Sequence, residues 1–141
     1  MKFDESLFDK LARSHPGLMI RAEFDAGSAQ RLVITMAGYL DANNSGAFTE
    51  AMNGVIDAYG GLQLIVFDLE RLTYISSTGI GAFANVLIRA KQKGIVLSLV
   101  KLGQNVRAVF DVLGISGFFS IAGSLDEALS GTPSPKYDLE N

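Results

Sequence analysis

The chain contains no cysteine, no tryptophan and a single histidine, His15, among its 141 residues. Without cysteine it has no disulfides, no thiolate nucleophile and no cysteine-based zinc site. One histidine excludes a metal site built from several histidines and leaves a single candidate for a histidine-based proton shuttle. We therefore expect a protein that is not an enzyme, with no catalytic residue, no bound metal and no cofactor.

The sequence also has no excess of basic residues and no long apolar run. Twelve Lys and Arg residues stand against 15 Asp and Glu residues, for a formal net charge of −3. Proteins that bind nucleic acid normally carry a basic surface, and a membrane-spanning helix needs about 18 consecutive apolar residues. The first residues include acids and no apolar signal-peptide core. We expect a cytoplasmic protein with no membrane insertion and no nucleic-acid partner.

The apolar pattern predicts strands that alternate with helices. Turn-forming residues 25–28 separate two β-rich segments, 17–25 and 30–37, which indicates an antiparallel hairpin. Two later segments, 62–67 and 95–100, are nearly all apolar, as in strands covered on both faces. A short strand is expected over 118–121. Helices are expected over residues 4–14, 45–59, 78–93, 104–113 and 124–129. This order predicts an α/β fold with a mixed sheet of about five strands and helices packed mainly on one face.

The same pattern suggests how the chain is divided. Residues 1–16 are expected to be an N-terminal extension with a short helix, and residues 17–130 a single domain. Residues 131–141 contain two prolines among polar residues, so we expect a disordered tail.

Three consecutive hydroxyl side chains, those of Ser76, Ser77 and Thr78, precede or begin the helix expected over 78–93. One hydroxyl suffices to cap a helix N-terminus, so three exceed that need. The free amides and dipole of a helix N-terminus favour negative charge, and a phosphoryl group carries about −1.5 to −2 charges. A phosphorylation site and simple capping both remain open.

The helix over 78–93 divides into two expected faces. The core face is predicted to carry Ile80, Phe83, Ala84, Leu87, Ile88 and Lys91. The opposite face has small, weakly charged side chains, which suit either a docked partner or burial under another element of the same fold. It carries Gly81, Ala82, Asn85, Val86, Arg89 and Ala90.

Two other functions are considered for this region, dinucleotide binding and the binding of a nucleotide or anion. Gly79-Ile80-Gly81-Ala82-Phe83-Ala84 matches a loose dinucleotide-binding pattern, but that motif needs a turn directly after the strand and an acid about 20 residues further on. The expected strand ends well before Gly79, and residues 99–101 offer no acid. Asp41 and Asn43, in the polar loop expected over 38–45, could instead form a nucleotide or anion site with the hydroxyl run.

Four segments together resemble the STAS domain of bacterial anti-sigma factor antagonists, over about residues 17–130. The first is Gly38-Tyr39-Leu40-Asp41, which is similar to the Gly-x-Leu-Asp of that family. The second runs from Leu64-Ile65-Val66-Phe67-Asp68-Leu69 through Leu72-Thr73-Tyr74-Ile75 into Ser76-Ser77-Thr78-Gly79-Ile80-Gly81. The others are Gly94 with Ile95-Val96-Leu97-Ser98-Leu99-Val100, and Val106-Arg107-Ala108-Val109-Phe110 with Leu113-Gly114-Ile115 and Phe118-Phe119.

The resemblance implies a phosphorylation-dependent switch between partners. Members bind an anti-sigma factor that is also a serine kinase of the histidine-kinase-like ATPase type. The kinase phosphorylates a hydroxyl at the start of the second main helix, which breaks the complex, and a metal-dependent serine phosphatase restores it. The matching acceptor is Ser77, with Ser76 and Thr78 as alternatives. Ser76 stands where the family usually has Asp.

The residues expected to contact the partner are Asp41, Asn43, Ser76, Thr78, Gly79, Gly81, Ala82, Asn85 and Arg89. A constitutive scaffold without phosphorylation and a small-ligand sensor are the alternative functions, and a homodimer is also compatible with the sequence.

Overall fold

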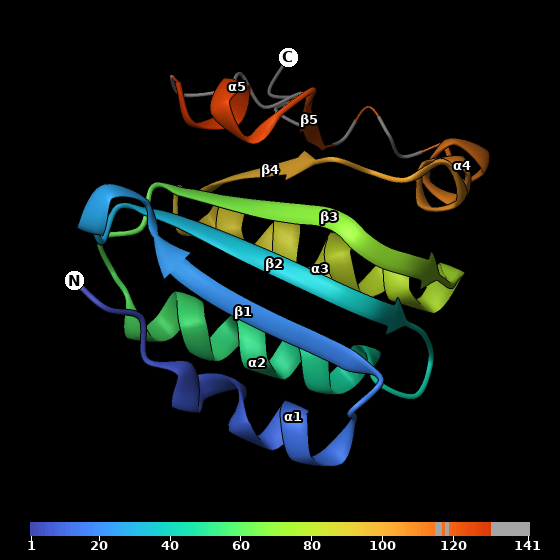
Figure 1. The fold of residues 1–141 in the computed structure, drawn as a ribbon, viewed down its shortest axis with the longest axis horizontal. Coiled ribbons are helices and arrows are strands. Elements are labelled where there is room, and N and C mark those ends of the chain that lie inside the picture. Colours follow the sequence, from blue (N-terminus) through green and yellow to red (C-terminus); the bar gives the residue numbers. More distant parts are fainter. Residues whose placement is uncertain (115–116, 118, 131–141) are drawn as a thin grey trace.

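A mixed five-stranded sheet forms the centre of the protein in the computed structural model, which describes residues 1–114, 117 and 119–130. The strands lie in the order β1-β2-β3-β4-β5 (Figure 1). β1 pairs antiparallel with β2, and the other neighbours pair in parallel. Their bounds are Leu18–Phe24, Arg31–Leu40, Leu64–Ile75, Val96–Val100 and Ser120–Ala122. The expected hairpin and the expected mixed α/β sheet are confirmed. Phe118, included in the expected last strand, lies outside the described residues, and so do residues 131–141, for which a disordered tail was expected.

Helices cover the sheet unequally. The first part of the chain forms a 3-10 turn, η1 (Glu5–Phe8), and α1 (Asp9–Ser14), and a second turn, η2 (Asp25–Gly27), follows β1. The later helices are α2 (Ser45–Ala58), α3 (Ser77–Gln92), α4 (Gln104–Val112) and α5 (Leu125–Leu129). Figure 1 shows α1, α2 and α3 on one face of the sheet. None of the described helices is long and apolar enough to span a membrane.

Two apolar clusters hold these layers together. On the α2–α3 face, the rings of Phe48 and Phe67 each lie 5.2 Å from that of Phe83, joining both helices to β3. On the opposite face, Ala128 of α5 packs with Val66 of β3 and Val100 of β4. Because side chains alternate across a strand, the central apolar strands serve both clusters. This explains why their sequences are almost continuously apolar.

The structure corrects the expected length of β2 and β3. β3 has 12 residues and ends at Ile75, where a loop was expected after residue 67. Its second half buries Leu69, Leu72 and Ile75, three residues apart. Two register shifts in the pairing with β2 accompany this spacing. Irregular pairing hides the two-residue alternation on which strand prediction relies. β2 likewise continues through Gly38 to Leu40, into the segment expected to be a loop.

The two long strands end side by side. Leu40 pairs with Ile75, the last residue of its strand, and the Ser76 amide donates a hydrogen bond to the Leu40 carbonyl at 3.0 Å. The segment that leads into α2 and the hydroxyl run therefore leave the sheet next to each other. Only Ser76, Ser77 and Thr78 separate β3 from Gly79, so the distance argument against a dinucleotide motif is wrong.

Candidate functional site

The first hydroxyl of the run, that of Ser76, caps α3. Ser76 has extended backbone geometry, and its Oγ accepts a hydrogen bond from the Gly79 amide at 3.1 Å. Its carbonyl accepts the first helical bond, from the Ile80 amide at 2.9 Å. Serine at this position satisfies an amide that the helix itself cannot pair. Capping therefore accounts for one hydroxyl of the three.

The side chains of Ser77 and Thr78 are exposed on the first turn of α3. Among the described residues, neither hydroxyl has a hydrogen-bond partner. Both hydroxyls are thus open to solvent beside the amides of a helix N-terminus, where added negative charge is stabilised. The structure gives these two hydroxyls no role in holding the fold together.

Gly79 permits the close approach of α3 to the sheet. A Cβ atom at this position would lie 2.7 Å from the Leu40 carbonyl oxygen and 2.9 Å from Cγ1 of Ile75. Gly79 is buried, so it serves packing within the fold and offers no surface to a partner. It was expected to contact the partner directly, and its burial corrects that expectation.

The neighbouring loop after β2 is held by Asp41 and Asn44. Asp41 Oδ1 accepts hydrogen bonds from the amides of Asn43, at 2.9 Å, and Asn44, at 3.3 Å. The Asn44 side chain accepts from the Asp41 amide at 2.9 Å and donates to the Tyr39 carbonyl at 3.0 Å. The Ser45 hydroxyl donates to the Asp41 carbonyl. The Asp41 carboxylate is therefore committed to the loop, whereas the Asn43 side chain is exposed.

Asn44 is the residue of this site that sequence reasoning missed. It is almost fully buried, and its amide group joins the end of β2 to the start of α2. Buried amide side chains normally have such partners, because an unpaired one is costly. An Asn three residues after an Asp, at the passage from strand to helix, is the signal that could have identified it.

The expected division of α3 into two faces is partly wrong. Ala82, Val86 and Ala90 are buried, while Ile88, assigned to the core, is 56% exposed. α3 packs against both the sheet and α2, so its buried stripe is wider than one sheet contact would require. This burial also corrects the assignment of Ala82 to partner contact. Seven residues of α3 are exposed: Ser77, Thr78, Gly81, Asn85, Ile88, Lys91 and Gln92. We call the first five of them, up to Ile88, the outer face of α3.

Arg89 lies at the border of that face. Its guanidinium donates a hydrogen bond to Asp57 of α2, forming an ion pair between the two helices. Both side chains are partly exposed, so this pair contributes little to stability. The outer face of α3, as defined, contains no charged residue.

A small cavity lies beside the loop. It has a volume of about 210 Å³ and is lined by residues including His15, Tyr39, Asp41 and Asn43. Ser76, Ser77 and Thr78 do not line it. This cavity therefore does not bring the loop and the three hydroxyls together, as the expected small-ligand site would require. In the described part of the chain, no cluster of three or more His, Asp or Glu side chains is arranged to hold a metal ion.

Because Ser76 caps α3, replacing Ser76 should lower the stability of the protein more than replacing its neighbour Ser77. Ser76→Ala should lower the free energy of unfolding by about 1 kcal/mol, because the Gly79 amide loses its partner. Ser77→Ala should change it by less than about 0.5 kcal/mol, as is usual for an exposed side chain without partners. Urea unfolding of the two variants measures both values. Equal losses would contradict the assignment of Ser76 as the cap.

Comparison with known proteins identifies similar chains. The sequence model of the STAS domain family matches residues 19–128. BtrV of Bordetella bronchiseptica, provisionally named as an anti-sigma factor antagonist, is 30% identical over 97 residues, which are 69% of this chain and 82% of BtrV.

Solved structures agree in fold. The anti-sigma factor antagonist SpoIIAA in its unphosphorylated form superposes with a TM-score of 0.67 at 20% identity, covering 79% of this chain and 94% of SpoIIAA. The phosphorylated form of SpoIIAA from Bacillus gives a TM-score of 0.60 at 20% identity, covering 79% and 97%. At this level of identity the likeness concerns the fold.

Proposed function

Because the chain belongs to the STAS domain family, we propose that it is an anti-sigma factor antagonist, a regulatory domain that acts by binding an anti-sigma factor. The observation that carries the proposal is the first turn of α3, where two exposed hydroxyls without partners adjoin an uncharged helix face. The binding surface would be the outer face of α3 with the Asp41–Asn44 loop beside it. The partner would be a serine kinase of the histidine-kinase-like ATPase type.

Phosphorylation at Ser77 would switch this binding. Of the three hydroxyls, that of Ser76 is engaged in the cap, and Ser77 is the position that the resemblance matches to the acceptor. Thr78 shares the exposure of Ser77 and is the closest alternative. A metal-dependent serine phosphatase would remove the phosphoryl group and restore binding.

The physical basis of the switch is the cost of burying charge. A phosphoryl group carries about −1.5 to −2 charges at neutral pH. On a free helix N-terminus it is solvated and stabilised by the amides. Within an interface that supplies no cation it must lose water without compensation, which costs several kcal/mol. The phosphoryl group would therefore cost little in the free protein and would destabilise the complex.

Mass spectrometry after a kinase reaction tests the acceptor. We expect incubation with ATP and the histidine-kinase-like serine kinase encoded nearest to the gene to give one phosphoryl group per chain, on Ser77. Ser77→Ala should abolish this modification, and Thr78→Ala should leave it in place as a matched control. Modification that persists at another residue in Ser77→Ala would refute the assignment.

A constitutive scaffold is the second candidate, and Ser76 favours it. This residue stands where the family usually has a carboxylate next to the acceptor, so the kinase loses a charged group close to its target. The variant Ser76→Asp distinguishes the scaffold from the switch. If the protein is switched by phosphorylation, restoring this carboxylate should make the kinase phosphorylate it faster. A scaffold should bind its partner with the same affinity whether or not Ser77 carries charge.

A further inference from the structure

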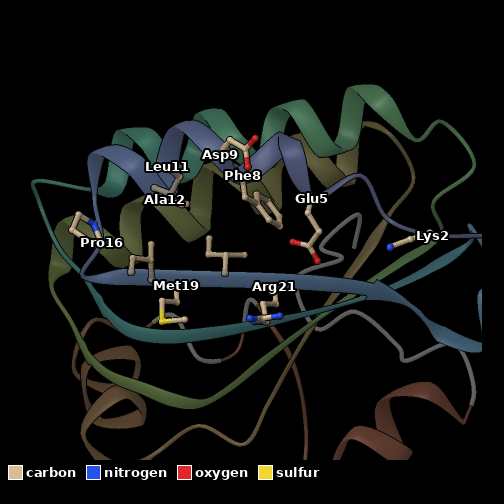
Figure 2. A pocket seen from close by; sticks show the side chains of 11 residues that line it. Lys2, Glu5, Phe8, Asp9, Leu11, Ala12, Pro16, Met19 and Arg21 are labelled. Carbon is tan, nitrogen blue, oxygen red and sulfur yellow. The ribbon is translucent and has the colours of Figure 1, made fainter.

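The cavity beside the loop after β2 is enclosed by two parts of the chain and has a volume of about 210 Å³. Residues 14–17, where α1 passes into β1, form half of its lining, and the end of β2 with the following loop forms the rest. Figure 2 shows Pro16 at the corner between α1 and β1. Residues 14–17 precede the range 19–128 that matches the STAS domain family. The cavity therefore depends on a segment outside the shared domain.

Backbone contacts fix the two walls of the cavity relative to each other. The His15 amide donates to the Leu11 carbonyl at 2.8 Å, and the His15 carbonyl accepts from the Leu18 amide at 3.1 Å. The Gly17 carbonyl accepts a hydrogen bond from the Tyr39 amide at 3.2 Å. A Cβ atom at Gly17 would overlap the Tyr39 ring, so the ring lies directly against the Gly17 backbone. The walls are thus joined by contacts at the start of β1 and the end of β2.

The walls carry polar groups that the fold leaves unengaged. Within the described part of the chain, no hydrogen bond is formed by the side chains of four lining residues, Ser14, His15, Tyr39 and Asn43. The loop amides engage only Oδ1 of Asp41, and among the same residues Oδ2 has no partner. A few polar groups that converge on one cavity are the means by which binding sites orient a ligand.

The charge of the lining favours a cation. With His15 counted as neutral, Asp41 carries the only charge, and no Lys or Arg lines the cavity. The larger groove between α1 and β1 in Figure 2 differs, because both acidic and basic residues line it. The hydroxyl, amide and carboxylate oxygens of the smaller cavity can all accept hydrogen bonds. A positively charged group with several N–H donors would satisfy them together.

The volume of the cavity indicates a single side chain. Sites for drug-sized molecules usually measure about 300–1,000 Å³, so this cavity suits one side chain better than a nucleotide. A guanidinium presents five N–H donors in a plane, matches a carboxylate and stacks on aromatic rings. Building on the proposed function, we propose that the cavity receives an arginine side chain of the anti-sigma factor. Asp41 is its counter-ion, and the Tyr39 ring and the end of α1 form the walls around it.

The position of the cavity points to the same partner that binds α3. The Leu40 carbonyl accepts from the Ser76 amide, so the loop that forms one wall leaves the sheet beside the hydroxyl run. A partner that covers the outer face of α3 and this loop also reaches residues 14–17. Ser77 does not line the cavity, so the arginine pairs with Asp41 and not with a phosphoryl group on Ser77. The N-terminal segment thereby adds a contact that selects among related anti-sigma factors.

Titration of the full chain with Nα-acetylarginine amide tests the cavity without the partner. NMR spectra should show saturable shifts of the Gly17 and Asn43 amides. The citrulline analogue has the same shape without the charge and should bind about tenfold more weakly or less. Asp41→Asn keeps an acceptor for the loop amides and removes the charge, so it should weaken arginine binding by a similar factor. The absence of saturable shifts, or equal binding of the two compounds, would overturn the proposal.

Calorimetric titration with the histidine-kinase-like serine kinase encoded nearest to the gene tests the contact in the complex. Asp41→Asn should lower the affinity by about tenfold or more, because the arginine is left without its counter-ion, and His15→Ala should lower it less, because only packing is lost. Asp126→Asn removes the same charge from an exposed residue of α5 and should have no effect.

The outcomes of this second titration separate the two proposals. Unchanged affinity of Asp41→Asn would overturn the arginine contact, and unchanged affinity of His15→Ala would overturn the role of the N-terminal segment. Failure of the kinase to bind the unmodified chain would refute the proposed function and, with it, the source of the arginine. The titration with Nα-acetylarginine amide would still decide whether the cavity binds a guanidinium.

Discussion

Ser77→Asp is expected to weaken binding to the anti-sigma factor by about a hundredfold. The substitution places a carboxylate on the uncharged outer face of α3, where complex formation would strip it of water. A loss of about 2.8 kcal/mol, which corresponds to this factor, lies within the cost of burying an unpaired charge. Isothermal titration of the purified proteins measures the change, and Ser77→Ala should bind like the unmodified chain.

Two controls separate this effect from a general effect of charge. Gln63→Glu adds a negative charge to an exposed residue just before β3, at the opposite end of that strand from Ser77, and should leave the affinity unchanged. Ser77→Asp should also retain or slightly raise the unfolding free energy, because an acid is favourable in the first turn of a helix. Equal binding by Ser77→Asp and Ser77→Ala would contradict the proposed switch.

Gly38→Ala is expected to cause the largest loss of stability. Gly38 has a φ of +104°, a region that other residues rarely adopt, and a Cβ there would lie 2.0 Å from the Gly17 carbonyl oxygen. Backbone strain and overpacking each cost about 1–3 kcal/mol, so we expect a loss of about 3 kcal/mol or more. Thermal and urea unfolding measure it.

Gly46→Ala is the matched control for that substitution. A Cβ at Gly46, in the first turn of α2, would meet no atom within 4 Å. Its replacement should leave stability unchanged or raise it by up to about 1 kcal/mol, since the unfolded chain loses freedom. A Gly38→Ala variant as stable as Gly46→Ala would show that the two strands can separate at Gly17 without cost.

The elements whose apolar residues recur with a regular period were predicted well from the sequence. The hairpin of β1 and β2 and the helices α2 and α4 follow their apolar patterns closely, because each buries one stripe or one face. β3 was predicted too short, because Leu69, Leu72 and Ile75 recur every three residues where its pairing with β2 is irregular. A single sequence carries no sign of that irregularity, which depends on the partner strand.

The candidate site was predictable in its chemistry and less so in its surfaces. The run of hydroxyls indicated a helix start, and the structure assigns one of them, Ser76, to the cap. Which side of α3 faces solvent depends on its packing against α2 as well as against the sheet. Val86 and Ala90 are buried and Ile88 is exposed. The position of Asn44 as the link between β2 and α2 required the folded loop.

Affinity capture from the native cell tests the central claim most directly. The account predicts that the immobilised unmodified chain and Ser77→Ala both retain a protein with a histidine-kinase-like ATPase domain, identified by mass spectrometry, and that Ser77→Asp does not. Retention of that protein by all three chains, or by none of them, would contradict the account.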